Sequence, residues 1–132
     1  MNDFKDYGLV FLRLGIGFAF LWAGIHKLFI AGPAAGWMAE FFASWPFLQW
    51  VMPTPLGVLE LCIGILLIVG LFTRIVGIIA TILLLGFIVT VSAGVTGGFS
   101  SYMWQPVAIL GGAICLAFTG STPISLDGLF WR

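Results

Sequence analysis

Charged side chains are scarce in this sequence of 132 residues. They make up 8% of the chain, whereas soluble domains carry about 25%. Five Lys and Arg balance five Asp and Glu, so the sequence has no basic patch that could serve a nucleic-acid partner. Hydrophobic residues account for 61% of the chain and the mean hydropathy is +1.19. These proportions exclude an ordinary water-soluble domain and predict a protein that is solvated by the lipid bilayer.

Cysteine and the motifs of soluble chemistry are also nearly absent. Cys62 and Cys115 lie in apolar runs without CxxC or metal-ligand spacing, so neither a disulfide framework nor a metal site is expected. The sequence contains no GxxxxGK[ST], HExxH or GxSxG motif, and no GxGxxG motif opens a helix after a strand. Glycine is plentiful instead, with 18 residues. This abundance favours closely packed membrane helices.

Four apolar segments indicate the fold. They cover residues 7–30, 54–72, 75–93 and 104–118, and a helix of roughly 20 residues is needed to cross about 30 Å of hydrocarbon. Breaks in the pattern fall at Pro53 to Pro55, at Thr73-Arg74 and between Gly94 and Ser101. We therefore expect a single all-α membrane domain over residues 1–132, built as a four-transmembrane-helix bundle.

The segment between the first two spans is too long and too aromatic for a simple loop. If residues 36–45 form a helix, its apolar side carries Met38, Phe41, Phe42 and Trp45. Such a segment is typical of an interfacial amphipathic helix, with tryptophan at the membrane surface. The alternative is a packed hairpin loop with accidental periodicity.

The positive charges predict an orientation. Four spans place both termini on one side, which then holds Lys5, Arg13, Arg74 and Arg132, and leave Lys27 on the other. Because Lys and Arg are retained on the cytoplasmic side, both termini are expected in the cytoplasm and the protein in the cell inner (plasma) membrane.

Four ionisable residues in the first two spans are the ligand or ion-pair candidates: Arg13, His26, Lys27 and Glu60. Charges inside a membrane are costly and mark functional sites by default. Lys27 and Glu60 should both lie toward the outer leaflet, so we predict that they pair. His26 is expected to point about 100° away from Lys27, and Arg13 to reach the cytoplasmic surface along its own stem. The sequence assigns no catalytic residue.

Glycines flank these charges on both helices. Gly17 and Gly24 lie on the face of the first span that carries Lys27, and Gly57 and Gly64 surround Glu60 on the second. Small residues let helix backbones approach closely, which predicts that the two faces pack together. Two interpretations of the pair stay open. It either fixes helix register, or it forms an outward-opening polar pocket in which Lys27 meets an anionic or quinone-like ligand and Glu60 handles a proton.

The order of these residues resembles a known family. Arg13-Leu14-Gly15-Ile16-Gly17 is followed by Lys27-Leu28, by Glu60 and Gly64, and by Gly70-Leu71-Phe72-Thr73-Arg74. This pattern resembles the DoxX family of small four-helix membrane proteins over about the whole chain. The resemblance implies that Arg13, Lys27, Glu60 and Arg74 occupy the family's charged positions. It also implies a link to redox chemistry, since relatives include a membrane subunit of thiosulfate:quinone oxidoreduction and members of oxidoreductase complexes that handle thiols.

Three functions follow as hypotheses. The first is a small subunit or adaptor of a redox-linked complex, with quinone as the cofactor candidate and a redox protein or a second copy of the chain as partner. An apolar cleft with Lys27 or Glu60 at its polar end would favour it. The second is an oligomeric small-solute carrier or channel, which needs a wetted path. The third is a non-catalytic assembly factor, which needs only tight helix packing and an exposed face.

Overall fold

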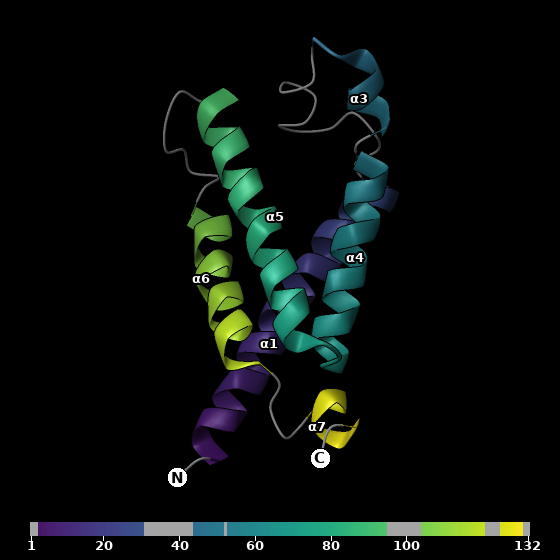
Figure 1. Ribbon diagram of the computed structural model, residues 1–132. Helices are drawn as coiled ribbons and strands as arrows, with labels where there is room; N and C mark the ends of the chain where they lie inside the picture. The colour runs from purple at the N-terminus through teal and green to yellow at the C-terminus, as the bar shows by residue number, and fades with distance from the viewer. Residues whose placement is uncertain (1–2, 31–43, 52, 95–103, 121–124, 131–132) are drawn as a thin grey trace.

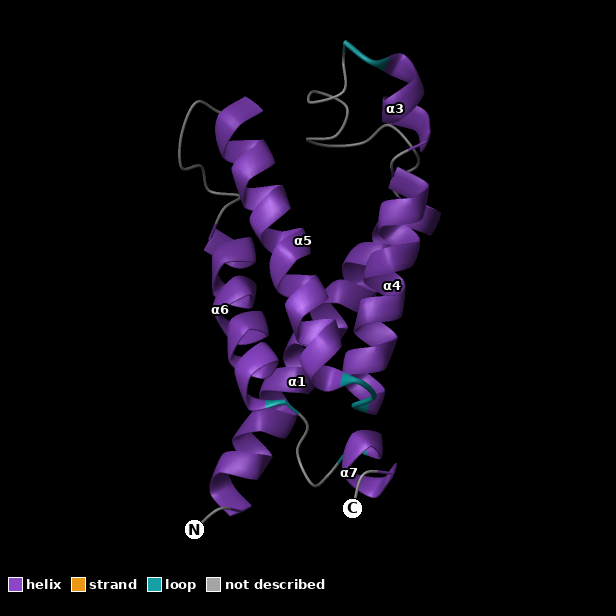
Figure 2. Ribbon diagram, viewed as in Figure 1, coloured by secondary structure: helices purple, strands orange, loops and turns teal. Residues whose placement is uncertain are grey.

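The computed structural model describes residues 3–30, 44–51, 53–94, 104–120 and 125–130. Within these ranges the chain is helical and contains no strand (Figure 2). The elements in chain order are α1 (Asp3–Ile25), the π-helix η1 (His26–Ile30), α3 (Pro46–Val51), α4 (Pro53–Val69), α5 (Thr73–Gly94), α6 (Trp104–Thr119) and α7 (Leu126–Phe130). The all-α prediction is thus confirmed.

The four longer helices form two pairs. Helix α1 packs along α4, and α5 packs along α6 (Figure 1). The pairs come together toward the end of the molecule where α4 turns into α5. The start of α1 and helix α7 lie at this same end (Figure 1). At the opposite end of the bundle the two pairs diverge (Figure 1).

A compact apolar core joins the two pairs. All four long helices contribute buried side chains to it: Ile16, Phe20, Ile63, Leu67, Val76, Ala80, Leu84, Ala113 and Leu116. Leu67 and Leu116 are fully buried. The outward faces are also apolar, as Phe11, Phe18 and Ile82 illustrate with more than half of their surface exposed. A bundle that is hydrophobic both inside and outside fits a lipid environment.

Among the described residues, one helix is long and apolar enough to cross a membrane, the continuous stretch Phe4–Ile30. The apolar parts of the other three are shorter: Thr54–Val69, Thr73–Val89 and Gln105–Thr119. The expected spans at 7–30 and 104–118 lie close to the observed helices. That all four helices cross the membrane stays a prediction.

The turn between α4 and α5 departs from the expected boundaries. Helix α4 ends at Val69 and not at residue 72, because Gly70 takes a φ of 76° and the Gly70 and Leu71 amides both donate to the Leu66 carbonyl. Helix α5 begins at Thr73, two residues before the expected start at Ile75. A carboxylate from the C-terminal helix α7 explains this early start, as described below.

The amphipathic helix expected at residues 36–45 lies mostly outside the described residues. Its last two positions, Ser44 and Trp45, are not helical. A short helix begins directly after them at Pro46. Proline suits a first helical turn because its missing N–H would be unpaired there in any case.

Candidate functional site

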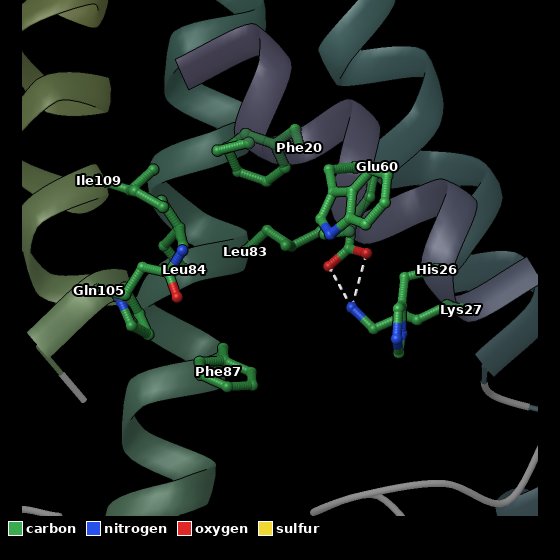
Figure 3. Close-up of a pocket in the computed structure, with 13 residues that line it drawn as sticks. Phe20, His26, Lys27, Glu60, Leu83, Leu84, Phe87, Gln105 and Ile109 are labelled. Atoms are coloured by element: carbon green, nitrogen blue, oxygen red, sulfur yellow. Dashed lines mark hydrogen bonds and ion pairs between the residues drawn. The ribbon is translucent and has the colours of Figure 1, made fainter. Parts of the chain in front are cut away.

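A cavity of about 400 Å³ lies between the two helix pairs. Its walls are mainly apolar, with Phe20 from α1, Leu83, Leu84 and Phe87 from α5, and Ile109 from α6 (Figure 3). Ala19, Trp22, Ala23 and Pro106 complete the apolar lining. Ligand sites of small molecules commonly combine such walls with a few well-placed polar groups.

An ion pair forms the polar end of the cavity. Lys27 Nζ lies 2.6 Å from Glu60 Oε1 and 2.6 Å from Glu60 Oε2, so one ammonium group donates to both carboxylate oxygens (Figure 3). The Glu60 side chain is 7% exposed and that of Lys27 is 20% exposed. The structure therefore brings together the two residues that the sequence pattern expected to pair, and both line the cavity.

The glycine interface, which consists of Gly17, Gly24, Gly57 and Gly64, sets this geometry. A Cβ at position 24 would lie 2.7 Å from the Leu61 amide nitrogen, and one at position 64 would lie 2.6 Å from that of Leu21. These distances leave no space for a side chain. Helices α1 and α4 can therefore approach closely enough for Lys27, in η1 directly after α1, to reach Glu60 on α4.

His26 lies beside the ion pair and not away from it. It is exposed, yet it lines the cavity together with Lys27 (Figure 3). The expectation that His26 would point away does not hold, because the cavity lining spans neighbouring faces of the first helix and includes Trp22, His26 and Lys27. His26 is also the first residue of a π-helix, His26–Ile30. Single π-helical turns are frequent at functional sites. Because His26 is exposed and also lines the cavity, it lies at the rim of the cavity.

Arg13 lies outside the cavity lining, and its expected position is wrong. It is buried within the protein, with 4% of its surface exposed, and so does not extend into water. Its guanidinium lies against Gly70, where a Cβ would come within 2.5 Å of it, and it interacts electrostatically with Asp127. A carboxylate supplied by the fold thus replaces the aqueous surroundings that Arg13 was expected to seek.

Asp127 is a residue that the sequence reasoning missed. Its Oδ1 accepts a hydrogen bond of 2.7 Å from the Phe72 amide, and its Oδ2 accepts one of 2.9 Å from the Thr73 amide. It therefore satisfies two free N–H groups at the start of α5. Ser125 and Asp127 carry the signature of a helix start, since the Gly128 amide donates to Ser125 Oγ. That signature predicts a short helix at α7, but it does not indicate that this helix contacts the turn between α4 and α5.

Two further charged or polar residues acquire roles only from the tertiary structure. Arg74 donates to the Phe118 carbonyl at 3.3 Å and so contacts the C-terminal end of α6. Gln105 lines the cavity from the α6 side, across from Lys27 and Glu60 (Figure 3). No local signal around Gln105 could have identified this position.

The comparison with known families agrees with the sequence resemblance. Among curated proteins and among solved structures, no match to the chain is found. The model of the DoxX family matches residues 8–93, which is more than half of the chain and includes Arg13, Lys27, Glu60 and Arg74. Gln105 and Asp127 lie beyond the matched residues. The chain belongs to the DoxX family and, by that membership, is a small membrane protein.

Proposed function

We propose that this protein binds a lipid-soluble small molecule between its two helix pairs, as a small subunit or adaptor of a redox-linked membrane complex. A quinone is the candidate ligand. One observation carries the proposal: an apolar cavity of about 400 Å³ ends at the Lys27–Glu60 pair. This volume falls within the range of roughly 300 to 1,000 Å³ that is common for small-molecule sites.

The proposal includes a four-span topology in the inner membrane, with both termini in the cytoplasm. Helices α4 and α6 contain 17 and 16 residues, and helices of that length rise roughly 24 to 26 Å. Small tilt and flanking residues compensate for such a short length. Arg74 lies in the first turn of α5, and the turn from α4 into α5 is at the same end as the start of α1 and helix α7 (Figure 1). Lys27 lies in η1, directly after the other end of α1, and this separation supports the proposed orientation.

The core favours a binding site over a carrier or channel. Leu67 and Leu116 are fully buried in the core that joins the helix pairs. Side chains of Leu12 and Ile16 also pack against Gly112, which brings α1 and α6 together. A path that crosses the bilayer would have to pass through these contacts. An assembly factor, in turn, would need no cavity that ends in a desolvated ion pair.

A pair of matched variants tests the proposal. Ala23 lines the cavity, and Ala108 is an exposed residue of α6 outside the lining. The wild type, Ala23→Phe and Ala108→Phe are purified in mild detergent and analysed for bound molecules by native mass spectrometry, with helical circular dichroism as the control for folding. We expect wild type and Ala108→Phe to retain a quinone and folded Ala23→Phe to lose it. Equal retention by the two variants, or an empty wild type that also fails to bind added quinone, would contradict the proposal.

A further inference from the structure

We propose that the cavity selects uncharged ligands that carry a hydrogen-bond acceptor, and that Glu60 is the residue that makes it reject anions. This inference rests on the proposed function, because it concerns the same cavity. It is narrower than the interpretation from the sequence, which allowed either an anionic or a quinone-like ligand to bind Lys27. Two properties of the ion pair determine this selectivity: its net charge is zero, and Lys27 keeps one free hydrogen-bond donor.

The charge at the polar end is cancelled within the protein. Both Glu60 oxygens lie 2.6 Å from Lys27 Nζ, so the carboxylate already occupies the position that an anion would seek. The other polar side chains of the lining are His26 and Gln105, and Lys27 is its one lysine or arginine. An anion in this apolar space would lose its hydration and lie beside the Glu60 carboxylate, and both effects oppose its binding.

The free donor at this position belongs to Lys27. An ammonium group has three N–H donors, and the two hydrogen bonds to Glu60 leave one of them without an acceptor among the described residues. The Lys27 side chain is 20% exposed and that of Glu60 is 7% exposed, so the donor is the more accessible partner. A ligand carbonyl can accept this hydrogen bond without bringing a charge.

Gln105 extends the same preference to the other side of the cavity. Its side-chain amide can donate and accept, and it lines the cavity across from the ion pair (Figure 3). Phe20 and Phe87 contribute aromatic surface between the two polar positions. The arrangement suits a flat, neutral head group with acceptors on opposite edges.

Two probes of nearly identical shape separate charge from fit. The first is 1,4-naphthoquinone, which is neutral, and the second is 2-hydroxy-1,4-naphthoquinone, whose hydroxyl group is ionised at neutral pH. The chain is placed in phosphatidylcholine nanodiscs, and dissociation constants are measured by quenching of Trp22, which lines the cavity. A Trp22→Phe variant assigns the signal, and empty nanodiscs correct for partition into lipid.

The wild type is expected to bind the neutral probe at least about tenfold more tightly than the anion. Glu60→Gln keeps the shape of the side chain and leaves Lys27 uncompensated, so it is expected to tighten anion binding by about tenfold while the neutral probe changes little. Ala23→Phe is expected to weaken both.

The outcomes distinguish the two proposals. Equal wild-type affinity for the probes, with both lost in Ala23→Phe, overturns the selectivity and leaves the cavity as a ligand site. Binding of neither probe to the wild type overturns the proposed function and the selectivity together. If Glu60→Gln does not fold, the ratio of the two wild-type affinities still decides the inference.

Discussion

Substitution of a single glycine measures how closely α1 and α4 must pack. In Gly64→Ala the new Cβ would lie 2.6 Å from the Leu21 amide nitrogen and 2.8 Å from the Gly17 carbonyl oxygen. Ordinary van der Waals contact begins at 3.4 Å, so the helices would have to separate by about 0.8 Å. Both neighbours are backbone atoms and cannot rotate away. We expect a loss of about 2 to 3 kcal/mol in the free energy of unfolding, the upper part of the range for overpacked sites.

Gly15→Ala is the matched control, because a Cβ there would meet no atom within 4 Å. Its effect is expected to be about 1 kcal/mol or less, and stabilising, since alanine favours a helix over glycine. Reversible unfolding in mixed detergent micelles, followed by circular dichroism, compares the two variants with the wild type. If Gly64→Ala is as stable as Gly15→Ala, the close approach of the two helices is not required.

Two further predictions concern the polar contacts. Lys27→Ala is expected to destabilise the protein by about 3 to 5 kcal/mol because it leaves a buried carboxylate without its partner. A second change, Glu60→Leu, is expected to restore most of this loss. Failure of the double variant to recover stability in the same unfolding assay would show that the pair does more than neutralise charge. Asp127→Ala removes the acceptor of two amides at the start of α5 and the carboxylate that interacts with the buried Arg13. It is therefore expected to cost more than the roughly 1 to 2 kcal/mol of a lost cap alone and to speed hydrogen exchange of those amides. Leu129→Ala, at an exposed position of α7, is expected to leave their exchange unchanged. Unaltered exchange in Asp127→Ala would contradict the capping role.

The relation between α1 and α4 could be predicted because it depends on scarce residues. In an apolar chain a lysine and a glutamate at similar expected depths have few other partners, and buried charges are expected to pair. Glycine spacing on the same helical faces then indicates which sides approach. The structure places Gly17, Gly24, Gly57 and Gly64 in that contact.

The opposite end of the bundle could not be predicted, because its contacts join residues far apart in sequence. Asp127 interacts with Arg13 and accepts hydrogen bonds from the amides of Phe72 and Thr73. Without α7 in place, an arginine near the end of a span is expected to extend toward water, and Thr73-Arg74 is expected to form a turn. The fold supplies the missing acceptor, so Arg13 is buried and α5 begins earlier.

The cavity could not be predicted either, because no local sequence pattern identifies the residues that form its walls. Its polar end consists of residues that were singled out as intramembrane charges, but its walls come from α5 and α6 as well. Leu83, Phe87 and Ile109 are ordinary apolar residues of membrane helices, and no pattern separates those that line a cavity from those that face lipid. The angle between the two helix pairs decides which of them do so.

Direct observation of the Lys27 ammonium group tests the central claim, that a lipid-soluble ligand binds at the polar end of this cavity. The chain contains two lysines, Lys5 and Lys27, so lysine-selective ¹⁵N labelling gives two side-chain signals in nanodiscs, and Lys27→Arg assigns them. Titration with a neutral quinone is predicted to shift the Lys27 signal saturably and to leave Lys5, which is exposed near the start of α1, unchanged. A Lys27 signal that does not move, or equal drift of both signals, would contradict the account.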